Sequence, residues 1–124
     1  MTKIIFIRHA KSDHSIKNDK LRPLTESGKH SAKSIPKLFK EIPIDFFYSS
    51  PYVRSLDTIK YLAKSKTKEI IIANDLRGRI VGDRLDDFMS YAKNQWKDFT
   101  YKLKNGESIS DVQSRYITEL NIIL

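Results

Sequence analysis

Residues 3–13, KIIFIRHAKSD, decide the fold class of this chain. Residues 3–7 form a short apolar run rich in β-branched side chains, which is typical of a strand buried on both faces. Arg8 and His9 follow directly and open a polar segment that continues to about Leu24. A strand that ends in an arginine and a histidine indicates an α/β protein, because functional side chains of parallel sheets lie at the carboxyl ends of strands.

Outward from this run, strand and helix patterns alternate. Apolar residues at spacings of three and four predict a helix after Thr25, its N-cap, and Pro36 is expected to kink or end that helix. Residues 45–48 read as a second strand. Ser50-Pro51 then predicts the cap and the first residue of a second helix.

A third strand is predicted at residues 69–73. A long amphipathic helix is predicted at residues 85–103, ended by Asn105-Gly106. A last helix is predicted to begin at a capping box formed by Ser108 and Asp111. Alternating strands and helices predict an α/β fold with a parallel sheet and right-handed crossovers, in a single domain over residues 1–124. Residues 49–54 follow the second strand, so we expect them at the same sheet edge as Arg8 and His9.

The composition is that of an ordinary globular chain, with 124 residues, 40% of them hydrophobic and 31% charged, and no cysteine. The lack of cysteine excludes disulfides and thiolate metal sites and favours a reducing cytoplasm. The first residues show no signal-peptide pattern, and no apolar run approaches the roughly 18 residues that a membrane helix needs. We therefore expect a cytoplasmic protein without a membrane partner.

The charge balance is basic, with 23 lysines and arginines against 15 acidic residues and a formal net charge of +8. Such a charge attracts anionic partners, which include phosphate esters and nucleic acids. We interpret the lysines at helical spacing as solvated helix faces, because no aromatic side chains alternate with them to stack bases. Nucleic-acid binding is kept as the third hypothesis for this chain.

Arg8, His9 and Arg54 together indicate an anion site that contains a nucleophile. A neutral imidazole can attack phosphorus through an unprotonated ring nitrogen and form a covalent phosphohistidine. Guanidinium groups, which are always protonated, can hold the peripheral phosphoryl oxygens bidentately. Arg54 is predicted about one turn into the second helix, whose amino end is expected to add backbone donors and a positive dipole. The alternative is that His9 caps a strand and that both arginines form surface ion pairs.

Five short motifs follow one another along the chain: IRHAKS, RPLTESG, YSSPYVRSLDT, DLRGR and NGES, the last with Arg115 downstream. In this order and spacing they resemble the histidine phosphatase superfamily, the phosphoglycerate-mutase-like group. The resemblance implies a three-layer α/β/α fold and metal-independent hydrolysis of phosphate monoesters, with no cofactor. It also implies roles for five residues, with His9 as the phosphorylated nucleophile, Arg8 and Arg54 as phosphate-binding arginines, and Ser12 and Arg22 as further phosphate or substrate contacts.

Two catalytic parts of the family pattern are absent from these 124 residues. The family places a second histidine after a fourth strand, and its usual acidic proton donor corresponds here to Gly78, which has no side chain. Loss of a general acid costs roughly 10²–10⁴ in rate, and loss of a donor to the phosphoryl group about 10²–10³. Phosphohistidine, aryl phosphates and acyl phosphates have better leaving groups and suffer less. Phosphohistidine phosphatases, which the Arg-His-Ala sequence also resembles, lack the same acid.

The chain stops inside an apolar pattern, at residues 120–124, before the fourth strand of the family. In the family that strand lies between the first two, so we expect an incomplete domain that lacks its carboxyl-terminal part, including a central strand. An unpaired strand promotes strand exchange. A homo-oligomer that covers the gap is therefore a further expectation.

The first hypothesis is a phosphatase rather than a mutase, which acts through His9 on a phosphorylated small molecule or a phosphoprotein. The second is a catalytically inactive remnant that binds phosphate or a phosphoprotein. A basic nucleic-acid-binding protein is the third. Residues 13–22 and 79–87 are the loops in which we expect substrate specificity to lie.

Overall fold

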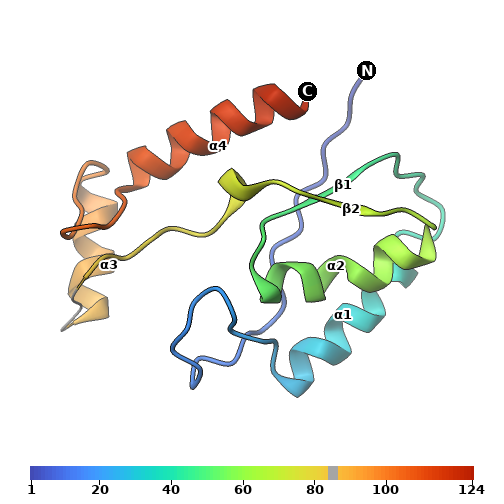
Figure 1. Cartoon of the computed structure of the whole chain (residues 1–124), viewed down its shortest axis with the longest axis horizontal. Coiled ribbons are helices and arrows are strands. Elements are labelled where there is room, and N and C mark those ends of the chain that lie inside the picture. The colour runs from blue at the N-terminus through green and yellow to red at the C-terminus, as the bar shows by residue number, and fades with distance from the viewer. Residues whose placement is uncertain (84–86) are drawn as a thin grey trace. The chain divides into compact units, whose positions relative to one another are not determined.

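The computed structural model describes residues 1–83 and 87–124. Its elements run in the order α1 (Glu26–Leu38), β1 (Phe47–Ser49), α2 (Val53–Ser65), β2 (Ile70–Ile72), the 3-10 turn η1 (Asn74–Leu76), α3 (Phe88–Lys97) and α4 (Ile109–Ile123) (Figure 1). The chain divides into two compact units, Met1–Asn74 and Asp75–Leu124. That both units form one domain stays a prediction.

The sheet of the first unit is parallel, as the alternation of elements predicts. Phe47 of β1 lies opposite Ile70 of β2, and Ser49 lies opposite Ile72. The Ala73 N–H extends the pairing by donating to the Ser49 carbonyl at 2.8 Å. Helix α2 is the crossover between the two strands, so the chain has the predicted α/β class with a small sheet.

Residues 3–7 do not form the predicted first strand. Their backbone makes no hydrogen bond to the described residues, and the side chains of Ile4, Ile5 and Phe6 are exposed. A strand requires a paired neighbour for its N–H and C=O groups, and an apolar pattern alone does not supply one. Ile7 nevertheless packs against the buried core, so the residue directly before Arg8 is held by the first unit.

Helix α1 begins as predicted, because the Thr25 side chain accepts the Gly28 N–H at 3.0 Å. The helix ends at Leu38, two residues after Pro36, which confirms that the proline stops the helical pattern. Helices α1 and α2 pack against each other (Figure 1).

The core of the first unit lies where α2 meets the sheet. Its buried side chains are those of Phe47, Ile59, Leu62 and Ala63, with Leu62 fully buried. Three of these four residues belong to α2 and recur at spacings of three and one, as expected for the buried face of an amphipathic helix. The packing therefore fixes the rotation of α2 about its axis.

Helix α2 starts later than predicted. Ser50 and Pro51 precede the helix, and Tyr52 is its N-cap without a side-chain cap bond. The N–H of Val53 is instead satisfied by the Lys20 carbonyl at 3.1 Å, so a distant loop replaces the expected serine cap. Arg54 is consequently the second helical residue.

The second unit contains α3 and α4. Helix α3 is shorter than the predicted helix over residues 85–103: it begins after its N-cap Asp87 and ends at Lys97, while Leu85 lies outside the described residues. The Asp98 carboxylate accepts the N–H and hydroxyl of Thr100, at 2.9 and 2.6 Å, and this local turn ends the helix.

The capping box of Ser108 and Asp111 is present at the start of α4, as predicted. Within the described part of the chain, no helix has the length and apolar character needed to cross a bilayer.

Candidate active site

His9 has one ring nitrogen committed to the backbone. Its Nδ1 lies 2.7 Å from the Ala10 carbonyl oxygen. Because a carbonyl oxygen can only accept, Nδ1 carries the proton in this bond, and the lone pair of the neutral ring is on Nε2. The side chain is half-buried. His9 therefore has the tautomer that leaves Nε2 available as a nucleophile.

The residue after His9 is tied to helix α2. The Ala10 N–H donates to the Thr58 hydroxyl at 2.9 Å, and that hydroxyl donates to the Arg54 carbonyl at 2.7 Å. Thr58 is 1% exposed. Hydrogen bonds thus connect the backbone at His9 with the helix turn that carries Arg54.

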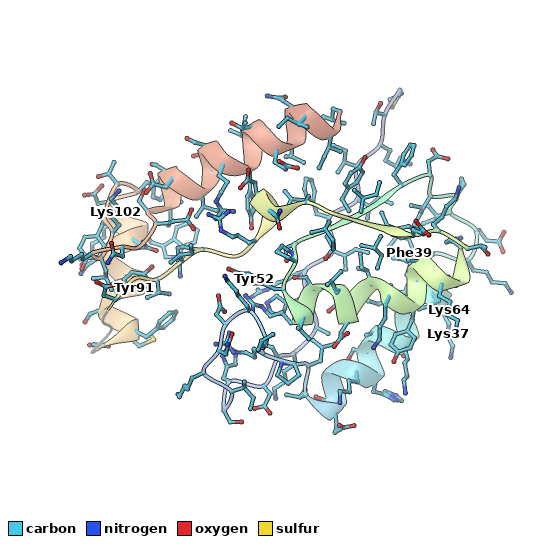
Figure 2. The ribbon with its side chains drawn as sticks, in the orientation of Figure 1. Lys37, Phe39, Tyr52, Lys64, Tyr91 and Lys102 are labelled. Carbon is cyan, nitrogen blue, oxygen red and sulfur yellow. The ribbon has the colours of Figure 1, made fainter. Side chains whose placement is uncertain are left out.

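Arg54 is buried at the amino end of α2, with 8% of its surface exposed. Its Nη1 donates to the Asp19 carbonyl oxygen at 2.6 Å and lies 3.1 Å from the Asp19 carboxylate. Its guanidinium carbon lies 4.8 Å from the centre of the Tyr52 ring, which Figure 2 labels at the start of α2. These contacts restrict Arg54 far more than a surface ion pair does.

The polar loop is closed at its base by a short antiparallel pairing. Asp13 N–H donates to the Pro23 carbonyl at 2.8 Å, and Thr25 N–H donates to the Lys11 carbonyl at 2.9 Å. Ser12 lies between these bonds, bridged to Leu24. The pairing holds the two ends of residues 13–22 together although the chain between them has no regular structure.

Ser12 is buried, with 4% of its surface exposed, and its Oγ has no hydrogen-bond partner among the described residues. An unsatisfied buried hydroxyl costs about 1–3 kcal/mol. The Ser12 hydroxyl is therefore able to donate to an incoming acceptor.

Arg22 and Arg54 meet at one carboxylate. Arg22 Nη1 lies 2.9 Å from Asp19 Oδ1, and Arg54 Nη1 lies 3.1 Å from the same oxygen. Arg22 Nε also donates to the Ile16 carbonyl at 3.1 Å. The structure thus brings two of the predicted arginines together and shows that an acidic residue balances part of their charge.

Arg8 differs from the other two arginines. It is exposed and makes no hydrogen bond or ion pair with the described residues. Its guanidinium group is therefore not committed within the first unit.

The amino end of α2 is less open than predicted. Lys20 supplies the carbonyl that binds the Val53 N–H, and the Ser55 N–H donates to the Tyr52 carbonyl at 3.0 Å. These two donors of the first turn are used within the protein. The expectation that the helix end offers its backbone donors to an anion is thus corrected for these two groups, because the carbonyls of Lys20 and Tyr52 already accept their hydrogens.

The second unit contains the DLRGR and NGES motifs, which form an ionic clasp around Glu107. Arg115 Nε and Nη2 donate to the two Glu107 oxygens, each at 2.9 Å, and the Ile80 N–H donates to Oε1 at 2.9 Å. Arg115 Nη1 also donates to the carbonyls of Asp75 and Arg77, at 2.6 and 2.9 Å. Arg115 thus fixes the segment after β2.

Glu107 is held in its ionised form by this clasp. Burial raises its pKa, but the hydrogen bonds from Arg115 and the Ile80 N–H, with the charges of Arg115 and Arg77, lower the pKa below its usual value. A carboxylate stabilised in this way is a poor proton donor. Glu107 is therefore the charged partner of Arg115 within the second unit.

Comparison with known families decides the identity of the fold. The family model "Histidine phosphatase superfamily (branch 1)" matches residues 4–124. The chain belongs to the histidine phosphatase superfamily. This confirms the resemblance carried by the five motifs, from IRHAKS to NGES, over nearly the whole sequence.

Similarity to two known proteins shows how much of their length this chain covers. The 2,3-bisphosphoglycerate-dependent phosphoglycerate mutase of Thermoplasma acidophilum is 38% identical over 72 residues, which are 54% of this chain and 36% of the mutase. The mycobacterial glucosyl-3-phosphoglycerate phosphatase, solved with inorganic phosphate, has 23% identity and a TM-score of 0.74, and the match covers 93% of this chain and 59% of that one.

A third similar structure is a protein from Nakamurella multipartitia assigned as the phosphohistidine phosphatase SixA, with 24% identity and a TM-score of 0.51 over 58% of this chain and 41% of that one. The matches thus span between 36% and 59% of the length of these proteins. The structural matches establish a shared fold with histidine phosphatases.

Two residues of the candidate site were not among those predicted from the sequence. Asp19 is recognisable only as the partner three residues before Arg22, a spacing that many solvent-exposed pairs share. Thr58 lies four residues after Arg54, on the same helix face, which is the one signal that connects it to the site.

Proposed function

We propose that this chain carries the phosphoryl-transfer half of a histidine phosphatase, with His9 as nucleophile and Arg8, Ser12, Arg22 and Arg54 as phosphate contacts. The observation that carries the proposal is the bond from His9 Nδ1 to the Ala10 carbonyl, because it leaves the lone pair on Nε2.

The proposed reaction has two steps. Nε2 of His9 attacks phosphorus, the bond from phosphorus to the leaving oxygen breaks, and the leaving group takes a proton from water. A second water then attacks the phosphohistidine and the nitrogen–phosphorus bond breaks, which restores the neutral ring and releases inorganic phosphate and a proton; that proton neutralises the hydroxide left by the first step. The sum is phosphomonoester plus water giving alcohol plus phosphate.

The charges of Arg8 and Arg54 support phosphate as the group that is bound. Arg54 is buried and positioned by Asp19, whereas Arg8 is exposed and uncommitted. A fixed guanidinium and a free one suit a phosphoryl group whose charge spreads over several oxygens. The buried Ser12 hydroxyl provides a neutral donor of the same kind.

The substrate class that we propose depends on whether a side chain can protonate the leaving group. Gly78 has no side chain, and the lowered pKa of Glu107 makes it a poor acid. We therefore propose substrates whose leaving group needs little protonation, with phosphohistidine, aryl phosphates and acyl phosphates ahead of alkyl phosphates. The name of the Nakamurella relative, a phosphohistidine phosphatase, agrees with this order.

The experiment is turnover of p-nitrophenyl phosphate between pH 5 and 8 by the chain and by His9→Ala. His30→Ala is the matched control, because His30 is an exposed histidine on α1. We expect activity in the chain and in the control, and a loss of about 10³-fold or more in His9→Ala. Equal rates in all three proteins contradict the proposal.

A second candidate function is phosphate binding without turnover. It is favoured by the paired arginines at Asp19, which would hold an anion whether or not His9 reacts with it. Acid-labile, base-stable phosphoryl labelling at His9 separates the two functions, because simple binding leaves no covalent mark. Binding of inorganic phosphate without such labelling supports the second function.

A further inference from the structure

The backbone of residues 8–10 makes a single hydrogen bond to the rest of the first unit. In the described part of the chain, the bond from the Ala10 N–H to the Thr58 hydroxyl is the only hydrogen bond that residues 8–10 make outside themselves. Residues 3–7 have no ladder partner that could hold the backbone from the other side. Thr58 is therefore the residue that holds the Ala10 N–H, while the next residue, Lys11, is held by Thr25.

The orientation of Ala10 in turn sets the orientation of the His9 ring. Ala10 gives its N–H to Thr58 and receives the Nδ1 proton of His9 on its carbonyl, so one residue carries both bonds. If Ala10 rotates, its carbonyl leaves Nδ1 and the tautomer of His9 is no longer fixed.

The Thr58 hydroxyl oxygen is suited to accept the Ala10 N–H at a fixed position. Its proton is used in the bond to the Arg54 carbonyl, 2.7 Å away in the preceding turn, so the oxygen lone pairs point away from that carbonyl. The oxygen can then only accept, and the Ala10 N–H is a pure donor. The β-branched side chain is stiff about χ1, and at 1% exposure it has no room to change rotamer.

We propose that Thr58 is the positioning residue of the phosphoryl-transfer site, whose hydroxyl holds the His9 backbone at a fixed place relative to Arg54. This inference rests on the proposed function of His9. Thr58 acts through Ala10 and does not itself bind phosphate. A displacement of about 1 Å between a nucleophile and its phosphate contact is enough to cost about 10²-fold in rate.

The test compares Thr58→Val, which removes the hydroxyl at nearly constant volume, with Thr58→Ser, which keeps it. Ser65→Ala is the matched control, because Ser65 is also on α2 and also donates its hydroxyl to a helix carbonyl, that of Leu62 at 2.6 Å. Thr58→Ala replaces the valine variant if valine prevents folding, and thermal unfolding shows that each variant is folded at the assay temperature.

For p-nitrophenyl phosphate we expect kcat of Thr58→Val to fall about 10²-fold with little change in KM, because the arginines are retained. Thr58→Ser and Ser65→Ala are expected to remain within about threefold of the original kcat. An unchanged kcat in Thr58→Val, or a serine variant as impaired as the valine variant, overturns the proposal.

A second readout does not depend on turnover. Nitrogen-15 NMR of the His9 ring reports its tautomer, and hydrogen exchange of the Ala10 amide reports the bond to Thr58. We expect Thr58→Val to lose the single tautomer and the protection, and Thr58→Ser to keep both. If the original chain has no activity, the proposed function fails, whereas unchanged ring signals in Thr58→Val overturn the role of Thr58.

Discussion

The Asp19 carboxylate lies between two guanidinium groups, with its Oδ1 2.9 Å from Arg22 Nη1 and 3.1 Å from Arg54 Nη1. The bridge fixes the distance between two residues that are 32 positions apart in the sequence (54 − 22). It also places a negative charge at the site that we propose for a phosphate. Asp19 thus orients the arginines and opposes the anion that they are to bind.

Asp19→Asn separates these two effects, because asparagine keeps an acceptor oxygen but removes the charge. We expect inorganic phosphate to bind roughly threefold to tenfold more tightly at low ionic strength, and the difference to shrink at high salt. Calorimetric titration with phosphate at two salt concentrations measures this. Asp57→Asn, on the same helix as Arg54, is the control. Weaker binding by Asp19→Asn means that the charge is needed to hold the arginines.

Arg54→Lys is expected to lower both stability and phosphate affinity. Lysine cannot reach the Asp19 carbonyl and carboxylate together while lying over the Tyr52 ring, so we expect a loss of about 1–3 kcal/mol in the free energy of unfolding. Arg8→Lys is the comparison, since Arg8 is exposed and its replacement is expected to change stability by less than about 0.5 kcal/mol. Urea unfolding of both variants measures the free energy of unfolding. Equal losses of stability in the two variants contradict the assignment of Arg54 as the fixed arginine.

Gly28→Ala is expected to disrupt the base of the polar loop. A Cβ on Gly28 collides with the carbonyl of Lys11, a backbone group that is itself bonded to Thr25. Overpacking of this kind costs about 1–3 kcal/mol, and here it pushes apart the pairing that holds Ser12. The free energy of unfolding is the measurement, with Ser31→Ala on the same helix as control. A Gly28→Ala variant as stable as the control refutes the close approach.

The clasp around Glu107 predicts a pH dependence of stability. The pKa of Glu107 is lower in the folded protein than its ordinary value of 4.5, so its contribution to stability is present above that pH and is lost as the pH falls through the lowered pKa. Glu107→Gln is therefore expected to cost roughly 1–2 kcal/mol at pH 7 and progressively less below pH 4.5. Urea unfolding at pH 7 and pH 3 tests this. If the loss of stability caused by Glu107→Gln is the same at both pH values, the charge of Glu107 does not contribute and the prediction is wrong.

Local sequence signals predicted the helix starts that depend on nearby residues. Thr25 caps α1 and Ser108 with Asp111 forms the capping box of α4, because each bond joins residues three positions apart. The parallel pairing of β1 with β2 also followed from the alternation of elements.

Features that depend on distant contacts were missed. The start of α2 is set by the Lys20 carbonyl, and no local pattern reveals that a loop supplies this cap. Near the end of α3, Gln95 donates to the carbonyls of Tyr101 and Glu107, 6 and 12 positions along the chain, whereas the turn at Asp98 that follows the helix is local and was overlooked. Residues 3–7 have the composition of a strand, but strand formation requires a partner that composition cannot specify.

The residues of the candidate site differ in the same way, between those with a local sequence signal and those that depend on distant contacts. His9, Arg8 and Arg54 were predicted because their chemistry is recognisable from residue type and motif. Asp19 and Thr58 were missed because their hydrogen bonds to Arg54 and to Ala10 span 35 and 48 positions, and their local spacing to Arg22 and Arg54 is shared by many ordinary helix and loop pairs.

The commitment of His9 Nδ1 to the Ala10 carbonyl determines which of two chemical isomers the proposed reaction produces. A phosphoryl group carried by this ring is attached to Nε2, which gives the τ isomer, and the π isomer is excluded as long as Nδ1 keeps its bond. The two isomers differ in phosphorus-31 chemical shift and in their rates of acid hydrolysis. An isomer-specific antibody raised against τ-phosphohistidine is consequently the appropriate reagent for detecting the modified chain in a cell extract.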